Sequence, residues 1–275
     1  MPELPEVETV VRILRDKIEG LTITKTKINL EKLLKSSGTI NAFETDITGR
    51  TIETIERIGK NIIFNLDDKV LISHLRMTGR WYVYKNNEIH DTKHDLAYFE
   101  LSNKTTLVFN DSRRFGTFHY QNKSEYEYIN PIVKVGPEPL NDLIDGEYLF
   151  NKMSKSNRYI KTLLLDQTIV SGIGNIYADE ILFSSNINPL KKGSDVSPDD
   201  YQKIAKNSQK ILNQAIKLGG STIDSYYPEQ GVSGQFQTKL QVHTRVGKKC
   251  FVCQTKINKI KVNGRGTYYC KTCQN

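Results

Sequence analysis

Four cysteines constrain the fold of this chain more than any other feature of its sequence. Cys250, Cys253, Cys270 and Cys273 follow the pattern C-x2-C-x16-C-x2-C. Two such knuckles can bring four thiolate sulfurs around one tetrahedral Zn²⁺. No His or Asp lies among them to leave a coordination position open, so the expected metal is a single structural ion. The alternative is two disulfides, which a reducing cytosol disfavours.

The positive charge of the chain lies in the same segment. The formal net charge is +8, and no Asp or Glu follows Glu229. Nine basic residues follow it: Lys239, Arg245, Lys248, Lys249, Lys256, Lys259, Lys261, Arg265 and Lys271. Subtracting these nine charges leaves −1 for residues 1–229. A concentrated basic patch attracts polyanions, of which nucleic acid is the commonest, whereas the alternative is a solvated lysine-rich tail.

The length of 275 residues suggests about two domains at roughly 150 residues each. No stretch is apolar enough to cross a bilayer. The N-terminus has Glu3, Glu6 and Glu8 where a signal peptide would have a basic patch followed by an apolar run. We therefore expect a cytoplasmic protein rather than an exported one.

The hydrophobic pattern changes period along the chain. Apolar residues recur at helical spacing from Leu4 to Ile18, which predicts an amphipathic helix. Between residues 21 and 120 the pattern becomes short β-rich runs, such as NIIFNL, KVLISHL and TTLVF, separated by turn residues. About eight such runs predict a β-sandwich.

A proline-rich stretch, NPIVKVGPEPLND, suits a linker before a second domain. Helical patterns then follow in GEYLFNKMSK, RYIKTLLLDQ, residues 175–184 and an N-capped segment from Ser197 to Leu218. The glycine-rich stretch at 219–238 predicts a long mobile loop, and the cysteine knuckles should be joined by a β-hairpin. The predicted boundaries are 1–130 for the helix and sandwich, 131–142 for the linker, 143–238 for the helical domain and 239–275 for the zinc hairpin.

Six strings in one order resemble the formamidopyrimidine-DNA glycosylase family. They are MPELPEVETV, SHLRMTG, DSRRFG, GIGNIYADE, GGSTI and the knuckles that end in GRGTYYC. The resemblance covers the whole chain. It implies a bacterial base-excision repair enzyme for oxidised purines such as 8-oxoguanine, with both glycosylase and abasic-site lyase activity. The partner would be damaged double-stranded DNA, and we expect a monomer that associates with the nucleoid.

The resemblance also implies a fold of class α+β with two domains. The N-terminal helix and antiparallel β-sandwich would form the catalytic domain. The second domain would contain a helix-two-turns-helix motif and the four-cysteine zinc β-hairpin.

Pro2 is the candidate nucleophile. Removal of Met1 would leave a secondary amine, and an α-amine titrates near ~8, so a usable fraction is neutral at pH 7. Attack on a sugar C1′ would give an iminium ion that permits β-elimination and then a second elimination. The alternative is that Pro2 only reflects N-terminal processing.

Glu3 adjoins this amine and Glu6 lies one helical turn further on, but two acids at a helix start can equally serve the helix dipole. The resemblance implies that Glu3 moves protons at the sugar and that Glu6 supports the site. It also implies that Lys60 stabilises charge in the pocket, where the sequence alone would indicate a solvated turn lysine. Arg265 lies between two glycines, which would let the backbone approach a phosphate. The candidate catalytic residues are therefore Pro2, Glu3, Lys60 and Arg265.

An enzyme that acts on a base must flip it out of the duplex and fill the gap. The resemblance implies that Met77, Arg114 and Phe115 do so, with Arg114 offering paired donors to the orphaned cytosine. Without the family resemblance, the sequence would indicate that Met77 and Phe115 are core residues and that Arg114 is a surface charge. Asn175 lies at a glycine-flanked helix start, where free backbone amides and its side-chain amide can bind phosphate. The resemblance implies that Lys161 is another phosphate contact and that His74, His94 and Arg113 contact the DNA backbone. Many relatives have a second histidine after His94 and Asp95, where this chain has Leu96.

Two alternatives remain. One is the sister glycosylase of oxidised pyrimidines, the endonuclease VIII type, which shares the proline mechanism and the zinc hairpin. The sequence MPELPEVETV and the Met77, Arg114 and Phe115 set resemble the purine branch instead. The other is a non-enzymatic zinc-hairpin DNA-binding protein, which gives no reason for Pro2 and Glu3.

Overall fold

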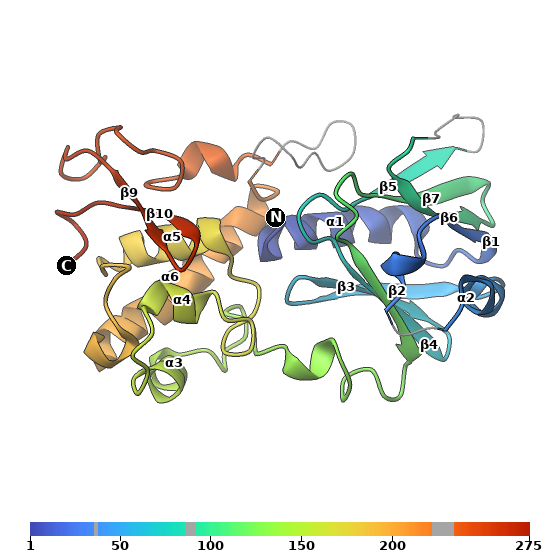
Figure 1. Cartoon of the computed structure of the whole chain (residues 1–275), viewed down its shortest axis with the longest axis horizontal. Helices are drawn as coiled ribbons and strands as arrows, with labels where there is room; N and C mark the ends of the chain where they lie inside the picture. The colour runs from blue at the N-terminus through green and yellow to red at the C-terminus, as the bar shows by residue number, and fades with distance from the viewer. Residues whose placement is uncertain (36–37, 86–91, 222–233) are drawn as a thin grey trace. The chain divides into compact units, whose positions relative to one another are not determined.

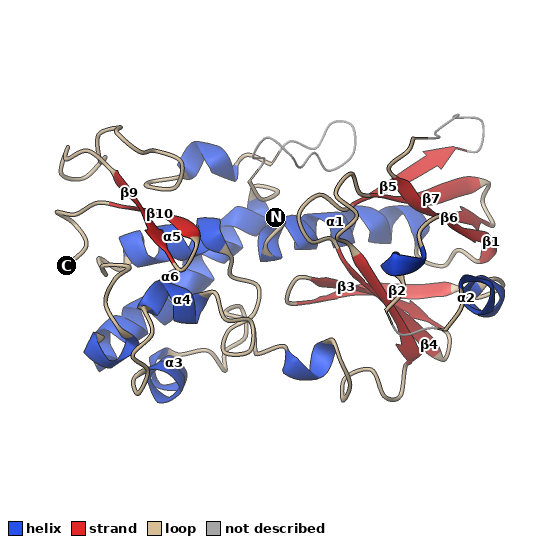
Figure 2. Ribbon diagram, in the orientation of Figure 1, coloured by secondary structure: helices blue, strands red, loops and turns tan. Residues whose placement is uncertain are grey.

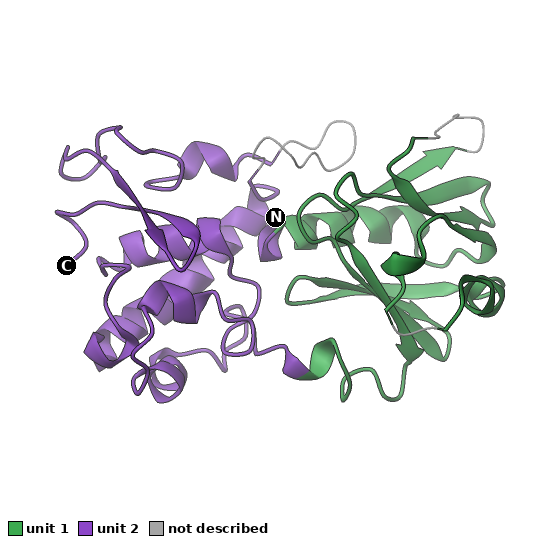
Figure 3. Ribbon diagram, in the orientation of Figure 1, with its two compact units in different colours: residues 1–2, 6–133, 222–233 green, residues 3–5, 134–221, 234–275 purple. Residues whose placement is uncertain are grey.

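The computed structural model describes residues 1–35, 38–85, 92–221 and 234–275, which form two compact units (Figure 3). Of these residues, unit 1 comprises Met1–Pro2 and Glu6–Val133. Unit 2 comprises Glu3–Pro5, Lys134–Ser221 and Gly234–Asn275. In the described ranges, no helix has both the length and the apolar character that a membrane span requires.

Unit 1 contains two helices and two four-stranded antiparallel sheets (Figures 1 and 2). These helices are α1 (Leu4–Ile18), which belongs to this unit from Glu6 on, and α2 (Ile40–Ile47). Glu31–Leu33 forms a 3₁₀ turn. One sheet has the order β1 (Ile23–Ile28), β6 (Asp95–Leu101), β7 (Thr105–Asn110), β5 (Arg80–Lys85). The other has the order β2 (Ile52–Ile58), β3 (Asn61–Leu66), β4 (Lys69–His74), β8 (Thr117–Asn122).

One hydrophobic core joins α1 and both sheets. The helix contributes its apolar stripe, including Val7, Val11 and Leu14, and the inward-facing residues of the strands complete the cluster. Trp81 lies within it, with its ring stacked on Phe118 at a centroid distance of 5.3 Å. Its indole N–H donates to Ser73 Oγ at 3.1 Å, which satisfies the buried polar atom. The predicted N-terminal helix and antiparallel sandwich are therefore confirmed.

Helix α2 interrupts the region that the sequence predicts as strands alone, so that part of the prediction is wrong. Thr39 caps it by accepting a hydrogen bond from the Ala42 N–H at 3.3 Å. Phe43 and Ile47, four residues apart, are buried against the sandwich. The helix is stabilised because its apolar residues lie on one face, which packs into the core.

Unit 2 combines helices with a two-stranded hairpin. Its helices are α3 (Gly146–Met153), α4 (Ile160–Leu164), α5 (Asn175–Ser184) and α6 (Pro198–Lys217). Its 3₁₀ turns are Gly193–Asp195 and Phe236–Lys239, and a third, Ile132–Lys134, lies where the two units meet in sequence. The hairpin pairs β9 (Asn258–Val262) with β10 (Arg265–Tyr269) in antiparallel register. This confirms the predicted helical domain with its hairpin between the cysteine knuckles.

The predicted mobile loop at 219–238 lies partly outside the described residues, at 222–233. Its two described ends are held together. Gln235 donates its N–H to the Leu218 carbonyl at 2.9 Å, and Phe236 donates to the Gly220 carbonyl at 3.0 Å. Both ends are therefore anchored at the C-terminus of α6.

Candidate active site

Glu3 is fixed at the N-terminus of α5, within unit 2. Its Oε2 accepts a hydrogen bond from the Gly174 N–H at 2.7 Å, and its Oε1 accepts one from the Ile176 N–H at 2.9 Å. The Tyr177 N–H lies 3.4 Å from Oε2. The first N–H groups of a helix have no partner within it, and their partial positive charge attracts a carboxylate. Glu3 therefore supplies the cap that no local side chain gives to α5.

This arrangement corrects one prediction for α5. The sequence suggests free backbone amides at its start for a phosphate, but those of Gly174 and Ile176 already donate to Glu3. Glu3 is 2% exposed and lies 171 residues before Gly174 in the chain. Gly174 makes room for it, because an added Cβ would lie 2.5 Å from Oε1 and 2.6 Å from Cγ of Glu3.

Pro2 and Glu6 flank Glu3 in sequence. Pro2 is buried two residues before α1 begins, and the preceding Met1 is exposed. Glu6 is buried in the first turn of α1, where an acid is favoured by the helix dipole. Both belong to unit 1.

Lys60 lies on the two-residue turn between β2 and β3. Ile58 and Asn61 pair across this turn, and Gly59 has a φ of 60°, as the first central position of a type II′ turn requires. A lysine on a tight turn is ordinarily solvated, yet Lys60 is only 5% exposed. The solvated turn lysine that the sequence alone would indicate is therefore not what the structure contains.

Asp111 organises two loops of unit 1 that carry predicted DNA contacts, and the sequence reasoning missed it. Its Oδ1 accepts hydrogen bonds from the Thr78 hydroxyl and from the Arg113 N–H, the latter at 3.1 Å. Its Oδ2 accepts from the N–H groups of Phe115 and Gly116 at 2.8 and 2.7 Å. The carboxylate is fully buried. The sequence signal that could have identified Asp111 is an acid inside the string DSRRFG, where Arg113, Arg114 and Phe115 are exposed.

The loops that Asp111 joins bring the three predicted wedge residues to neighbouring positions. Met77 is half-buried beside Thr78, and Arg114 is exposed with a left-handed φ of 56°. Phe115 is 47% exposed, which is unusual for so large an apolar side chain. The guanidinium of Arg113 lies over its ring, 4.8 Å from the centroid. A projecting apolar ring beside exposed guanidinium groups suits insertion into a duplex.

His74 ends β4 and has a defined protonation state. Burial lowers its pKa to about 3, and the positive charges of Arg76 and Lys60 act in the same direction. The imidazole is therefore neutral at pH 7. Because Nδ1 accepts the Arg76 N–H at 3.0 Å, the proton of the ring is on Nε2, where it can be donated to a phosphate.

His94 precedes β6 and is half-buried. Its Nδ1 is buried and has no hydrogen-bond partner among the described residues. A buried ring nitrogen without a protein partner calls for a water or a ligand atom.

In unit 2, Asn175 and Lys161 meet the hairpin that carries Arg265. Asn175 Nδ2 donates to the Gly266 carbonyl at 2.9 Å, and Lys161 Nζ donates to the same carbonyl at 3.1 Å. Lys161 also donates to Thr267 Oγ1 at 2.8 Å. Arg265 is exposed at the start of β10, directly before these anchored residues. The hairpin tip is thus fixed against α4 and α5.

Lys161 departs from its predicted role as a direct phosphate contact. The side chain is completely buried, and Nζ forms an ion pair with Asp179 Oδ1 at 2.7 Å. Burial lowers the pKa of Lys161, and the Asp179 carboxylate opposes that change. Its three donors are used by Asp179, Gly266 and Thr267, so the lysine supports the hairpin from within.

Asp179 and Glu180 also hold the segment before the first cysteine knuckle, and the sequence analysis gave neither residue a role. Asp179 Oδ2 lies 2.7 Å from His243 Nδ1. The Glu180 carboxylate accepts the N–H groups of Gln241, Val242 and His243 at 2.8, 3.0 and 2.8 Å. Two adjacent acids of α5 therefore hold the segment that leads into the first knuckle.

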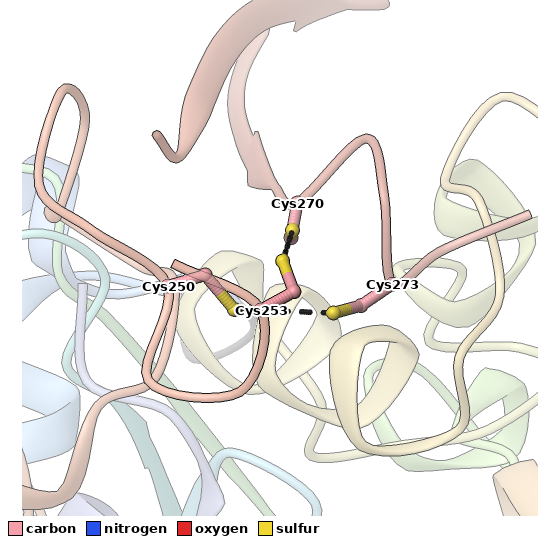
Figure 4. A group of neighbouring side chains, drawn as sticks. All are labelled: Cys250, Cys253, Cys270 and Cys273. Atoms are coloured by element: carbon pink, nitrogen blue, oxygen red, sulfur yellow. Dashed lines mark hydrogen bonds between the residues drawn. The ribbon is translucent and has the colours of Figure 1, made fainter. Parts of the chain in front are cut away.

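The four cysteines form a metal site (Figure 4). Their Sγ atoms all lie within 4.8 Å of one another, with Cys250–Cys273 at 3.9 Å and Cys253–Cys270 at 3.4 Å. Tetrahedral Zn²⁺ with Zn–S bonds of about 2.3 Å needs sulfurs about 3.8 Å apart, so the cluster fits the ion. Hydrogen bonds from the side chain and backbone of Thr255 lower the pKa of Cys253 to about 6, which favours the thiolate.

Comparison with known proteins accounts for nearly the whole chain. The model of the formamidopyrimidine-DNA glycosylase N-terminal domain matches residues 1–118, and the H2TH domain of the same family matches 135–226. A zinc finger found in FPG and IleRS matches 247–275. The formamidopyrimidine-DNA glycosylases of Oceanobacillus iheyensis and Mycoplasmopsis pulmonis are 43% and 44% identical, over 100% of this chain and 98% of each relative.

The chain belongs to the formamidopyrimidine-DNA glycosylase family.

Solved structures agree with this membership. Wild-type Lactococcus lactis Fpg (MutM) in complex with N7-benzyl-Fapy-dG DNA is 37% identical with a TM-score of 0.93, and 100% of each chain is covered. The Lactococcus lactis Fpg complex with abasic-site DNA has a TM-score of 0.92, 37% identity and 99% coverage of each chain. The predicted helix-two-turns-helix motif and the single structural zinc are therefore confirmed as parts of this formamidopyrimidine-DNA glycosylase family member.

Proposed function

We propose that this protein excises oxidised purines, including 8-oxoguanine and formamidopyrimidines, from duplex DNA and then cleaves the abasic site by β,δ-elimination. The support is family membership over the full length, together with relatives solved on lesion-bearing DNA. The observation that supports the chemistry is the fixed position of the Glu3 carboxylate. Glu3 directly follows Pro2 in the chain, and N–H groups at the start of α5 donate hydrogen bonds to its carboxylate.

Pro2 is the nucleophile in this account. After Met1 is removed, its amine has a pKa near ~8 and attacks C1′ while the glycosidic bond breaks. The base leaves and takes up a proton from solvent. Glu3 accepts the N–H proton of the attached proline and passes it to O4′ as the sugar ring opens, which leaves an iminium ion at C1′.

The iminium ion then drives strand cleavage. A carboxylate takes the C2′ proton, and the C–H electrons move toward the iminium to give an enamine. The enamine then forms a C2′–C3′ double bond and restores the iminium as the phosphate leaves C3′ with the electron pair of the C3′–O bond. Loss of the C4′ proton breaks the C5′–O bond in the same way. The products are a one-nucleotide gap with a phosphate at each end and the sugar fragment on Pro2, which water releases.

Lys60 and Arg265 stabilise negative charge in this reaction. Lys60 is a buried ammonium group, so its charge acts at lower dielectric than in water. Arg265 is exposed on an anchored hairpin and can bind a phosphate with two N–H groups. Asn175, His74, His94 and Arg113 add contacts to the DNA backbone, and Zn²⁺ holds the hairpin in its fold.

The wedge residues read the duplex. Phe115 and Met77 would fill the stack after the lesion is flipped, and Arg114 would pair with the cytosine left opposite it. The protein acts as a monomer on damaged double-stranded DNA. It works in the bacterial cytoplasm and associates with the nucleoid through its basic C-terminal segment, which carries nine Lys and Arg residues and no acid after Glu229.

Product analysis on defined duplexes tests this function. A duplex with 8-oxoguanine opposite cytosine should release free 8-oxoguanine and yield ends with phosphates on both sides of the gap. A matched duplex with undamaged guanine should remain intact. Faster release from a duplex with an oxidised pyrimidine would identify the sister pyrimidine glycosylase instead, and tight binding without base release would identify a non-enzymatic DNA-binding protein.

A further inference from the structure

The turn that carries Lys60 is held by a side chain from its own hairpin. Arg57, near the end of β2, donates from its terminal guanidinium nitrogen to the Gly59 carbonyl at 3.0 Å. Gly59 is the residue directly before Lys60, and its φ of 60° is the left-handed conformation on which the turn depends. The position of the Lys60 backbone is therefore coupled to the position of the Arg57 guanidinium.

Arg57 is in turn fixed to α1. Its Nε donates to Glu8 Oε2 at 2.9 Å, and the side chains of Arg57 and Glu8 are only 8% and 15% exposed. The second oxygen of Glu8 accepts from Arg12 Nε at 2.9 Å, one helical turn further on. Burial alone would raise the pKa of Glu8, but the hydrogen bonds from Arg57 and Arg12 hold it below its ordinary value. The carboxylate is therefore ionised at neutral pH.

A continuous chain of contacts thus links two parts of the active site inside unit 1. It runs from Glu8 on α1, through the Arg57 guanidinium, to the Gly59 carbonyl and the Lys60 turn. Helix α1, which carries Glu8, starts two residues after Pro2. Partly buried ion pairs with ordered geometry are more rigid than exposed ones.

We propose that Arg57, held by Glu8, is a positioning residue that sets where Lys60 lies relative to the Pro2 end of α1. This inference rests on the proposed role of Lys60 in the reaction. Lysine has a flexible four-carbon stem, so a fixed turn backbone restricts where its ammonium group can reach. A displacement of about 1 Å in a reacting group can cost about 100-fold in rate.

A double-mutant cycle on the full-length protein tests the proposal. Arg57→Met keeps the length of the stem but removes the donors to Glu8 and to the Gly59 carbonyl, and Lys60→Ala removes the group being positioned. Single-turnover release of 8-oxoguanine should fall about 10- to 100-fold in Arg57→Met, while the dissociation constant for undamaged duplex changes less than about 2-fold. In the Lys60→Ala background, Arg57→Met should have no further effect on the rate, because no lysine is left to misplace.

Arg50→Met is the matched control. Arg50 is likewise a largely buried arginine of unit 1, paired with Asp46 and Asp68, but it does not touch the Lys60 turn. Its replacement should leave the single-turnover rate unchanged. If Arg57→Met does not fold, Glu8→Gln removes the charge that holds the guanidinium while preserving the shape of the side chain, and it should show the same dependence on Lys60.

The outcomes separate this inference from the function on which it rests. If Lys60→Ala keeps the wild-type single-turnover rate, Lys60 has no role in the reaction, and the inference about Arg57 fails with it. A slow Lys60→Ala variant beside a fast Arg57→Met variant overturns the inference alone. Rate losses that multiply in the double variant would also overturn it, because Arg57 would then act independently of Lys60.

Discussion

Replacing Gly174 with alanine should displace the proposed catalytic carboxylate of Glu3 without substituting any catalytic residue. The backbone of Gly174 has a φ of −127°, which alanine adopts without strain. The new Cβ would lie 2.5 Å from Glu3 Oε1, where ordinary contacts begin at 3.4 Å, so the carboxylate must retreat by about 1 Å. That shift would stretch the hydrogen bonds from the Gly174 and Ile176 N–H groups.

A retreat of about 1 Å predicts a loss of about 100-fold in the single-turnover rate of 8-oxoguanine release. Weakening the cap of α5 should also cost about 1 kcal/mol of stability, which thermal unfolding would measure. Gly20→Ala is the control, because Gly20 has a φ of 80° with nothing within 4 Å of an added Cβ. It should lose about 1–2 kcal/mol through backbone strain and keep its full rate. A Gly174→Ala variant with an unchanged rate would refute the role given to the docked Glu3 carboxylate.

Three further predictions concern DNA binding. Removing Zn²⁺ with a chelator, or Cys250→Ser, should weaken duplex binding before it alters base release from bound DNA, and active protein without zinc by metal analysis would contradict this. Arg265→Ala should weaken binding to damaged and undamaged duplexes alike and flatten the salt dependence by about one unit, as titrations at several salt concentrations would show. Arg114→Ala should reduce the preference for cytosine opposite 8-oxoguanine by about 1–3 kcal/mol, and an unchanged ranking of the four opposite bases would mean that the side chain only fills space.

Features that depend on local spacing could be predicted from the sequence. The cysteine pattern is one, because two residues between ligands is what a zinc knuckle requires. The Ser197 cap of α6 is another, since it depends on residues within one helical turn. Helix α2 had a local signal too, in the Thr39 cap and the spacing of Phe43 and Ile47. The surrounding β-rich runs outweighed it.

Features that depend on contacts between distant segments could not be predicted. The interior position of Lys161 depends on Asp179 and on a hairpin more than 100 residues away. A lysine near a DNA-binding motif is most simply explained as a phosphate contact. Only the fold shows that the charge of Lys161 pairs with the buried Asp179 carboxylate inside unit 2. The same is true of Glu3, whose partners at α5 begin 171 residues later, and of Arg57 and Glu8, which are 49 residues apart.

The central claim is that the Pro2 amine forms the covalent bond to DNA. Borohydride reduction during reaction with an 8-oxoguanine:cytosine duplex should trap a protein–DNA adduct, and mass spectrometry of the digested adduct should find the modification on residue 2 after loss of Met1. Protein that retains Met1 should bind the duplex without forming an adduct. An adduct on Lys60 or another lysine, or full strand cleavage by protein that retains Met1, would contradict the account.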